Sequence, residues 1–200
     1  VLLFFAAKRS LFLFSLARTG RQSVGRFTDP TIRVAAEATE VLGQRKLLKW
    51  FVPGIAHVFA FWGFLVLGLT IIEAFGALYV ADFAVPIIGT WAIIGFAEDL
   101  FAILVLVGIT IFALIRLTND PRKEGRASRF FGSHTAGAWL ILFMIFNVVW
   151  TLFLYRAAQV NTGVFPFPDG AFASEYFATL INGLGIHTNE WIETVGLWLN

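Results

Sequence analysis

The sequence predicts an all-α integral membrane protein, a helical bundle with about five transmembrane helices, and its composition is the first reason. Of the 200 residues, 58% are hydrophobic and only 14% are charged. Soluble domains are roughly 45–50% apolar and about 25% charged. The apolar residues also form long unbroken runs, which indicate membrane helices rather than half-buried strands. The many Phe (23) and Trp (7) residues suit helices that end at a lipid–water interface.

The apolar runs predict three complete spans and a partial span at each end of the chain. The complete spans are expected at about residues 52–75, 95–117 and 134–155, each long enough for a hydrocarbon core of roughly 30 Å. The first partial span ends near Ala7, where the next two cations stop it, and "LFLFSLARTGRQ" then continues as an amphipathic surface segment. The last partial span begins near His187. Residues 1–200 are therefore expected to be one transmembrane domain, a fragment of a longer chain.

The positions of the positive charges predict the orientation of these spans. Of the fifteen Lys and Arg residues, nine lie in residues 8–49, five lie in residues 116–129, and the last is Arg156. The connections 76–94 and 157–186 contain none. By the positive-inside rule, the basic segments 8–49 and 116–133 lie in the cytoplasm and the protein crosses the cell (inner or plasma) membrane several times. Because topology explains the basic charge, nucleic-acid binding is not expected.

Two of the three histidines are expected at the same depth in the membrane. His57 lies about one turn into the second span, and His134 opens the fourth, which runs in the same direction. His187 opens the last span from the opposite side. Two neutral imidazoles on neighbouring helices can supply both axial bonds of a haem b. The alternative is that each histidine is an interfacial hydrogen-bonding residue, and for His187 this alternative is the favoured one.

Small, aromatic and cationic residues near His57 and His134 fit the same interpretation. A haem needs apolar walls, small residues where it approaches the backbone, and cations for its propionates. The expected wall residues are Gly54, Phe61, Trp62 and Gly63 in the second span and Gly132, Gly137 and Trp139 around the start of the fourth. The expected propionate partners are Arg45, Lys49 and Arg129.

Three acids are expected near the opposite ends of the spans. Glu98 and Asp99 lie at the start of the third span, and Glu73 lies near the end of the second. Carboxylates in this position can exchange protons with a quinone or quinol. The alternative is that they are solvated helix-end residues, since acids in a first turn also favour the helix dipole.

The chain has no cysteine, which excludes thiolate-bound metal and iron–sulfur clusters from residues 1–200.

Three long stretches carry a resemblance to a known family. "LGQRKLLKWFVPGIAHVFAFWGFLVLG", "GFAEDLFAILVLVGITIFALIRL" and "GSHTAGAWLILFMIFNVVWTLFLYRAAQ" resemble the membrane portion of actinobacterial heterodisulfide-reductase-related iron–sulfur oxidoreductases, which include the electron-transfer-flavoprotein dehydrogenases of mycobacteria. That portion is in turn similar to the haem b gamma subunit of respiratory nitrate reductase. The resemblance covers nearly the whole chain.

The resemblance implies that residues 1–200 form a cytochrome b-like domain, with a cytoplasmic iron–sulfur domain expected after residue 200. Such a protein is a membrane-bound, quinone-linked oxidoreductase. Electrons from fatty-acid β-oxidation would pass from reduced electron-transfer flavoprotein through iron–sulfur clusters and haem b to menaquinone. A haem-free membrane anchor that docks a soluble redox partner through the basic segments is the alternative function, and a small transporter is disfavoured because no span has a broken centre.

The family's haem ligands carry over onto this chain only in part. In the gamma subunit the ligands lie on the second and fifth helices. His57 matches the inner ligand of the second helix, and His187 lies where the outer ligand of the fifth belongs. The outer position on the second helix holds the apolar Leu67, and the inner position on the fifth would follow Asn200. The preferred pairing is His57 with His134, and a partner for His57 outside these residues stays open.

Overall fold

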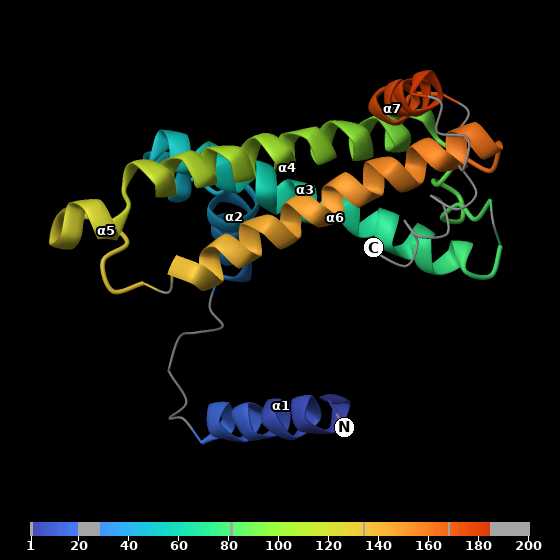
Figure 1. Ribbon diagram of the computed structural model, residues 1–200. Coiled ribbons are helices and arrows are strands. Elements are labelled where there is room, and N and C mark those ends of the chain that lie inside the picture. Colours follow the sequence, from blue (N-terminus) through green and yellow to red (C-terminus); the bar gives the residue numbers. More distant parts are fainter. Residues whose placement is uncertain (1, 20–28, 81, 134, 168, 185–200) are drawn as a thin grey trace. The chain divides into compact units, whose positions relative to one another are not determined.

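The computed structural model describes residues 2–19, 29–80, 82–133, 135–167 and 169–184, which are helical and contain no strand (Figure 1). The chain divides into two compact units, Val1–Gly43 and Gln44–Asn200. The helices of the first unit are α1 (Leu2–Arg18), α2 (Pro30–Glu37) and the π-helical turn η1 (Ala38–Leu42). Those of the second are η2 (Leu47–Lys49), α3 (Phe51–Ala77), α4 (Ala92–Thr118), α5 (Pro121–Glu124), η3 (Gly125–Ala127), α6 (Thr135–Thr162) and α7 (Phe172–Gly183).

Helix α1 in the first unit is one continuous helix of 17 residues. The prediction that Lys8 and Arg9 separate an apolar span from a distinct amphipathic segment is therefore wrong. Lys and Arg are good helix formers, so they end an apolar run without ending the helix. The guanidinium of Arg9 lies 5.5 Å from the ring centre of Phe12, one turn further along. Such a contact covers part of the ring and keeps the charge at the helix surface.

Among the described residues, three helices are long and apolar enough to cross a membrane: α3 with 27 residues, the helical stretch Ala92–Ala127 that begins with α4, and α6 with 28 residues. This confirms the fold class and the three complete spans predicted from the sequence. At about 1.5 Å per residue, α3, α4 and α6 are each roughly 40 Å long, so they extend past the hydrocarbon core. A total of about five spans is not confirmed, since the segment from His187 lies outside the described residues.

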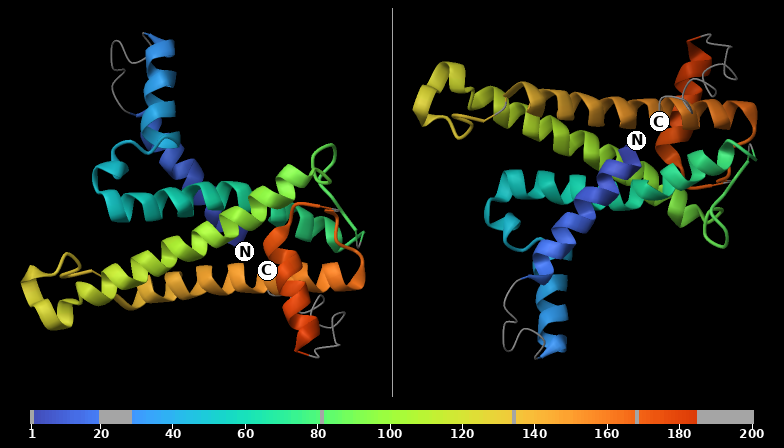
Figure 2. Two further views of the ribbon diagram at one scale, coloured as in Figure 1. Left: turned by 90° about the horizontal axis from the view of Figure 1, so that it is seen from above. Right: turned by 90° about the horizontal axis from the view of Figure 1, so that it is seen from below.

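Helix α4 lies between α3 and α6 and packs against both, and the three helices alternate in direction (Figures 1 and 2). Close packing of α3 on α4 depends on small residues. A Cβ atom on Gly63 would lie 2.1 Å from Val105 Cγ2, and one on Gly108 would lie 2.8 Å from the Ala56 carbonyl oxygen. Membrane helices commonly approach each other through such small residues, because they cannot gain from excluding lipid as soluble helices do from excluding water.

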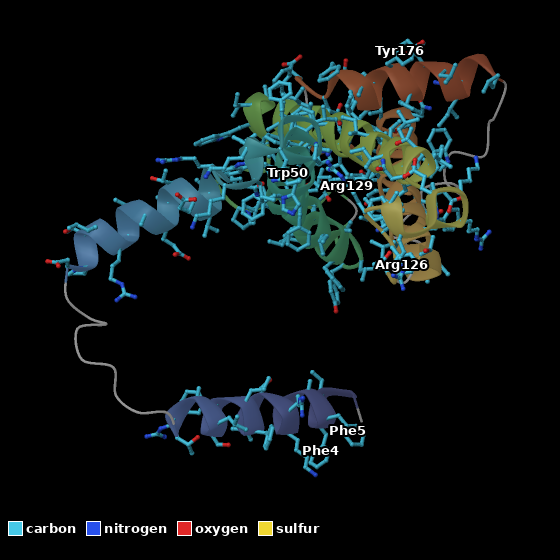
Figure 3. All side chains as sticks on the ribbon, turned by 90° about the vertical axis from the view of Figure 1, so that its left-hand side faces the viewer. Phe4, Phe5, Trp50, Arg126, Arg129 and Tyr176 are labelled. Carbon is cyan, nitrogen blue, oxygen red and sulfur yellow. The ribbon has the colours of Figure 1, made fainter. Side chains whose placement is uncertain are left out.

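The alternation of direction places η2, α5 and η3 at one end of the bundle (Figure 1). A contact between loops confirms this neighbourhood, because the Arg129 guanidinium lies 4.6 Å from the ring centre of Trp50 (Figure 3). The basic residues around 45–49 and 116–129 therefore share one end of the second unit. This is the arrangement that the positive-inside pattern requires of these two segments.

Helix α7 lies within the connection that follows α6, where the sequence indicates no helix. It has 12 residues and crosses α4 and α6 instead of running along them (Figure 2). The inner face of α7 is buried through Ala173, Ala178 and Ile181. The ring of Phe177 stacks on Phe153 of α6 with the ring centres 5.0 Å apart. The sequence indicates only a connection without cations over 157–186, and α7 does not stand out in it because twelve mixed residues are too short for a span.

Candidate functional site

A fully buried ionic cluster joins α4 to α6 at the end of the second unit opposite η2, α5 and η3. Glu98 and Asp99 of α4 are 0% and 1% exposed, and Arg156 of α6 is 3% exposed. Arg156 Nη1 donates to Glu98 Oε2 at 2.7 Å, and Arg156 Nε lies 3.6 Å from Asp99 Oδ1. Charged residues within a membrane span are rare and usually pair with one another. These three residues form the most polar buried site among the described residues.

Asp99 also fixes the beginning of α7. Its Oδ2 accepts hydrogen bonds from the backbone N–H groups of Ala173 and Ser174, both at 2.8 Å, and its Oδ1 accepts from the Ser174 hydroxyl at 2.7 Å. The first N–H groups of a helix have no partner within the helix, and a carboxylate there also favours the helix dipole. Asp99 therefore acts as a cap supplied by another helix.

Two aromatic rings from the segment after α6 enclose the Arg156 guanidinium. The ring centres of Phe165 and Phe167 lie 5.1 and 5.2 Å from the guanidinium carbon. Both are in the range of cation–π attraction, which is stronger where water is excluded. Even so, Arg156 Nε and Nη2 and Glu98 Oε1 are buried and have no hydrogen-bond partner. The cluster thus keeps unused donors and an unused acceptor.

The interpretation of Glu98 and Asp99 as solvated helix-end residues is wrong. Both lie in the second turn of α4, because the helix begins at Ala92 and not at Gly95. That extra turn carries them into the protein, where α6 and α7 cover them. Arg156 is a member of the site that was not predicted from the sequence. The available signal was that Arg156 is the one cation outside the two basic segments and lies within an apolar run.

His57 lies at the other end of the second unit, in the second turn of α3. Its Nδ1 lies 3.0 Å from Gln44 Oε1, while the residue as a whole is exposed. Gln44 is only 2% exposed, and its carbonyl oxygen accepts the N–H groups of Leu47 and Leu48. When Nδ1 carries the hydrogen, it donates to Gln44 and Nε2 keeps a lone pair. Metal-binding histidines are commonly oriented by such a second hydrogen bond.

The other predicted haem residues are brought together only in part. Arg129 lies over Trp50, the residue that precedes α3. Arg45 and Lys49 are exposed in the segment that leads into α3. These cations therefore share an end of the unit with His57. His134 and His187 lie outside the described residues, so the predicted pairing of His57 with His134 stays a prediction.

The predicted wall residues divide into two groups. Gly54 and Gly63 serve the packing of the chain itself, since a Cβ on Gly54 would lie 2.4 Å from the Leu47 carbonyl oxygen and one on Gly63 would meet Val105. Gly132 and Gly137 have no atom within 4 Å of such a Cβ. Gly132 and Gly137 are exposed, so the surface around the start of α6 is open at these positions, whereas Gly54 and Gly63 are already in contact. Phe61 and Trp62 are half-buried and meet edge to face at 5.9 Å, and Trp139 is exposed.

No group of three or more His, Cys, Asp or Glu side chains able to hold a metal ion occurs among the described residues. A haem needs only two axial nitrogens, and of the described residues His57 has that donor chemistry. Comparisons of the chain with family models, with curated proteins and with solved structures give no match. The contacts of the described residues therefore have to support any functional conclusion.

Proposed function

We propose that this chain is the membrane domain of a quinone-linked oxidoreductase of the cell membrane, in which haem b carries electrons between a cytoplasmic iron–sulfur module and menaquinone. In this proposal the module receives electrons from reduced electron-transfer flavoprotein, which fatty-acid β-oxidation supplies, and the two basic segments face the cytoplasm. A bound haem b would accept and release one electron at a time, which matches single-electron clusters to a two-electron quinone.

The geometry of His57 is the observation that supports a haem. Its Nδ1 is bonded to the buried Gln44, and its exposed ring leaves Nε2 open to a partner outside the described residues. A lone interfacial histidine has no need of a buried side chain to hold its ring in one orientation. His57 would hold one axial position and His134 the other, with Arg45, Lys49 and Arg129 near the propionates.

The buried ionic cluster suggests where protons could be handled. Proton exchange with a quinone needs a carboxylate that is not fully engaged. All the hydrogen bonds that Asp99 accepts hold α7, whereas Glu98 Oε1 accepts none. Within the predicted pair we therefore assign the proton-exchanging role to Glu98 and a positioning role to Asp99.

Visible spectroscopy on the purified full chain tests the proposal. The protein should show the reduced-minus-oxidised bands of a b-type haem, and His57→Ala should lose them. Thr110→Ala is the matched control, because Thr110 is also an exposed polar residue of a membrane helix and bonds only its own helix. A folded but colourless protein would contradict the proposal. It would favour the haem-free anchor that docks a soluble redox partner through the basic segments.

A further inference from the structure

A small cavity with a mixed polar and apolar lining lies between the ends of α3 and α6, beside the ionic cluster. Its lining includes Thr70 and Glu73 of α3, Tyr155, Arg156 and Gln159 of α6, and Phe167 of the following segment. The room inside it for the centre of a water molecule is about 10 Å³. One water needs on the order of 10–15 Å³ by this measure. The cavity therefore has the size of a single water and is far too small for a quinone ring.

Two of the residues that line the cavity each carry a buried polar atom without a hydrogen-bond partner, one a donor and one an acceptor. Arg156 Nη2 is buried and donates no hydrogen bond, and the whole Arg156 side chain is only 4% exposed. Glu73 Oε1 is also buried and accepts none. Leaving such groups unpaired away from water costs about 1–3 kcal/mol each, and more where the group is charged. A ligand that both accepts and donates would satisfy the two at once, and water is the smallest molecule that does so.

We propose that this cavity is a binding site for one internal water, which accepts a hydrogen bond from Arg156 and donates one to Glu73. The water connects the Glu98–Arg156 ion pair of α4 and α6 to Glu73 of α3. A continuous hydrogen-bonded network then links all three spanning helices. Buried waters in proteins typically make about three hydrogen bonds to otherwise unsatisfied groups. This inference is independent of the haem and holds equally for a haem-free anchor.

Hydroxyl-radical labelling by brief X-ray irradiation in ¹⁸O-water tests the site in the lipid-embedded full chain. Radicals formed from a held water label the side chains beside it, even where bulk solvent does not reach. Phe167 lines the cavity and is 3% exposed, whereas Phe153 is 1% exposed and packs in the apolar core. We expect labelling of Phe167 several-fold above that of Phe153. Equal labelling of the two rings in the native protein would overturn the proposal.

Substitution of Glu73 separates a held water from simple solvent leakage. Glu73→Leu removes the acceptor, so labelling of Phe167 should fall to the level of Phe153. Glu73→Gln keeps an acceptor oxygen and should keep the labelling. Glu175→Leu changes an exposed glutamate of α7 and should alter nothing at Phe167. Labelling of Phe167 that is unchanged in Glu73→Leu would also overturn the proposal.

Discussion

The guanidinium of Arg156 and the carboxylate of Glu98 lie 2.7 Å apart where the C-terminal part of α6 packs on the N-terminal part of α4, with both side chains almost fully buried. The two residues are far apart in the sequence, and the other described cations of the second unit lie in its basic segments around 45–49 and 116–129. Removing one member of a buried ion pair strands the other, whereas removing both can be nearly neutral. This asymmetry makes the pair testable.

Replacing Arg156 with Met should lower the free energy of unfolding by about 3–5 kcal/mol, because Glu98 is left as an uncompensated buried charge. Adding Glu98→Gln to that variant should recover a large part of the loss. Denaturant unfolding in detergent is measured for the unsubstituted protein, the two single variants Arg156→Met and Glu98→Gln, and the double variant. Together these four measurements give the coupling energy between Arg156 and Glu98 directly. Strictly additive effects of the two substitutions would contradict a direct pairing.

Replacing Asp99 with Ala should loosen α7 specifically, because three hydrogen bonds to its first turn are lost together. The expected result is fast hydrogen exchange at the amides of Ala173 and Ser174, while the middle of α4 stays protected. Capping interactions of this kind contribute about 0.5–2 kcal/mol each. Asp82→Ala, at an exposed acid, is the control and should leave α7 unchanged. Unchanged exchange in Asp99→Ala would show that packing alone holds α7.

Replacing Gly63 with Ala should destabilise the contact of α3 with α4, because the new Cβ would lie 2.1 Å from Val105 Cγ2. Overpacking of this kind typically costs about 1–3 kcal/mol. Gly68→Ala on the same helix is the matched control, since a Cβ there meets nothing within 4 Å. The control should be neutral or stabilise α3 by up to about 1 kcal/mol. Combining Gly63→Ala with Val105→Ala should restore part of the stability, which thermal unfolding can measure.

Replacing Gln44 with Ala should weaken haem binding while leaving the axial nitrogen of His57 in place. Loss of a hydrogen-bond partner behind a ligating histidine usually costs about 10- to 100-fold in affinity. Haem titration of the apoprotein measures the change, with Thr110→Ala as the reference variant. An unchanged haem affinity in Gln44→Ala would show that the 3.0 Å contact does not serve a ligand.

The spans were predictable because a lipid core of roughly 30 Å demands a long apolar run, and such a run is visible in the sequence itself. Their true ends were less predictable. Helix α4 begins at Ala92, three residues before its predicted start, and α6 ends at Thr162, seven residues after its predicted end. The last residues of α6 are mostly polar or small, so they belong to the helix but dilute its hydropathy signal.

The ionic cluster could not be predicted from the sequence in the same way. Glu98 and Arg156 are 58 positions apart, and only the packing of α4 on α6 brings them together. The role of Asp99 depends on α7, whose twelve residues do not have the length of a span. Sequence patterns report what surrounds a residue along the chain, whereas these contacts depend on which helix faces which.

The most direct test of a haem that exchanges electrons with menaquinone is the response of the purified full chain to a reduced menaquinone analogue, followed by its visible spectrum. The b-type haem bands should appear on addition of the quinol, and His57→Ala, with its fold intact, should show none. A folded protein without haem bands would contradict the proposed function. So would haem bands that chemical reductants produce but the quinol does not.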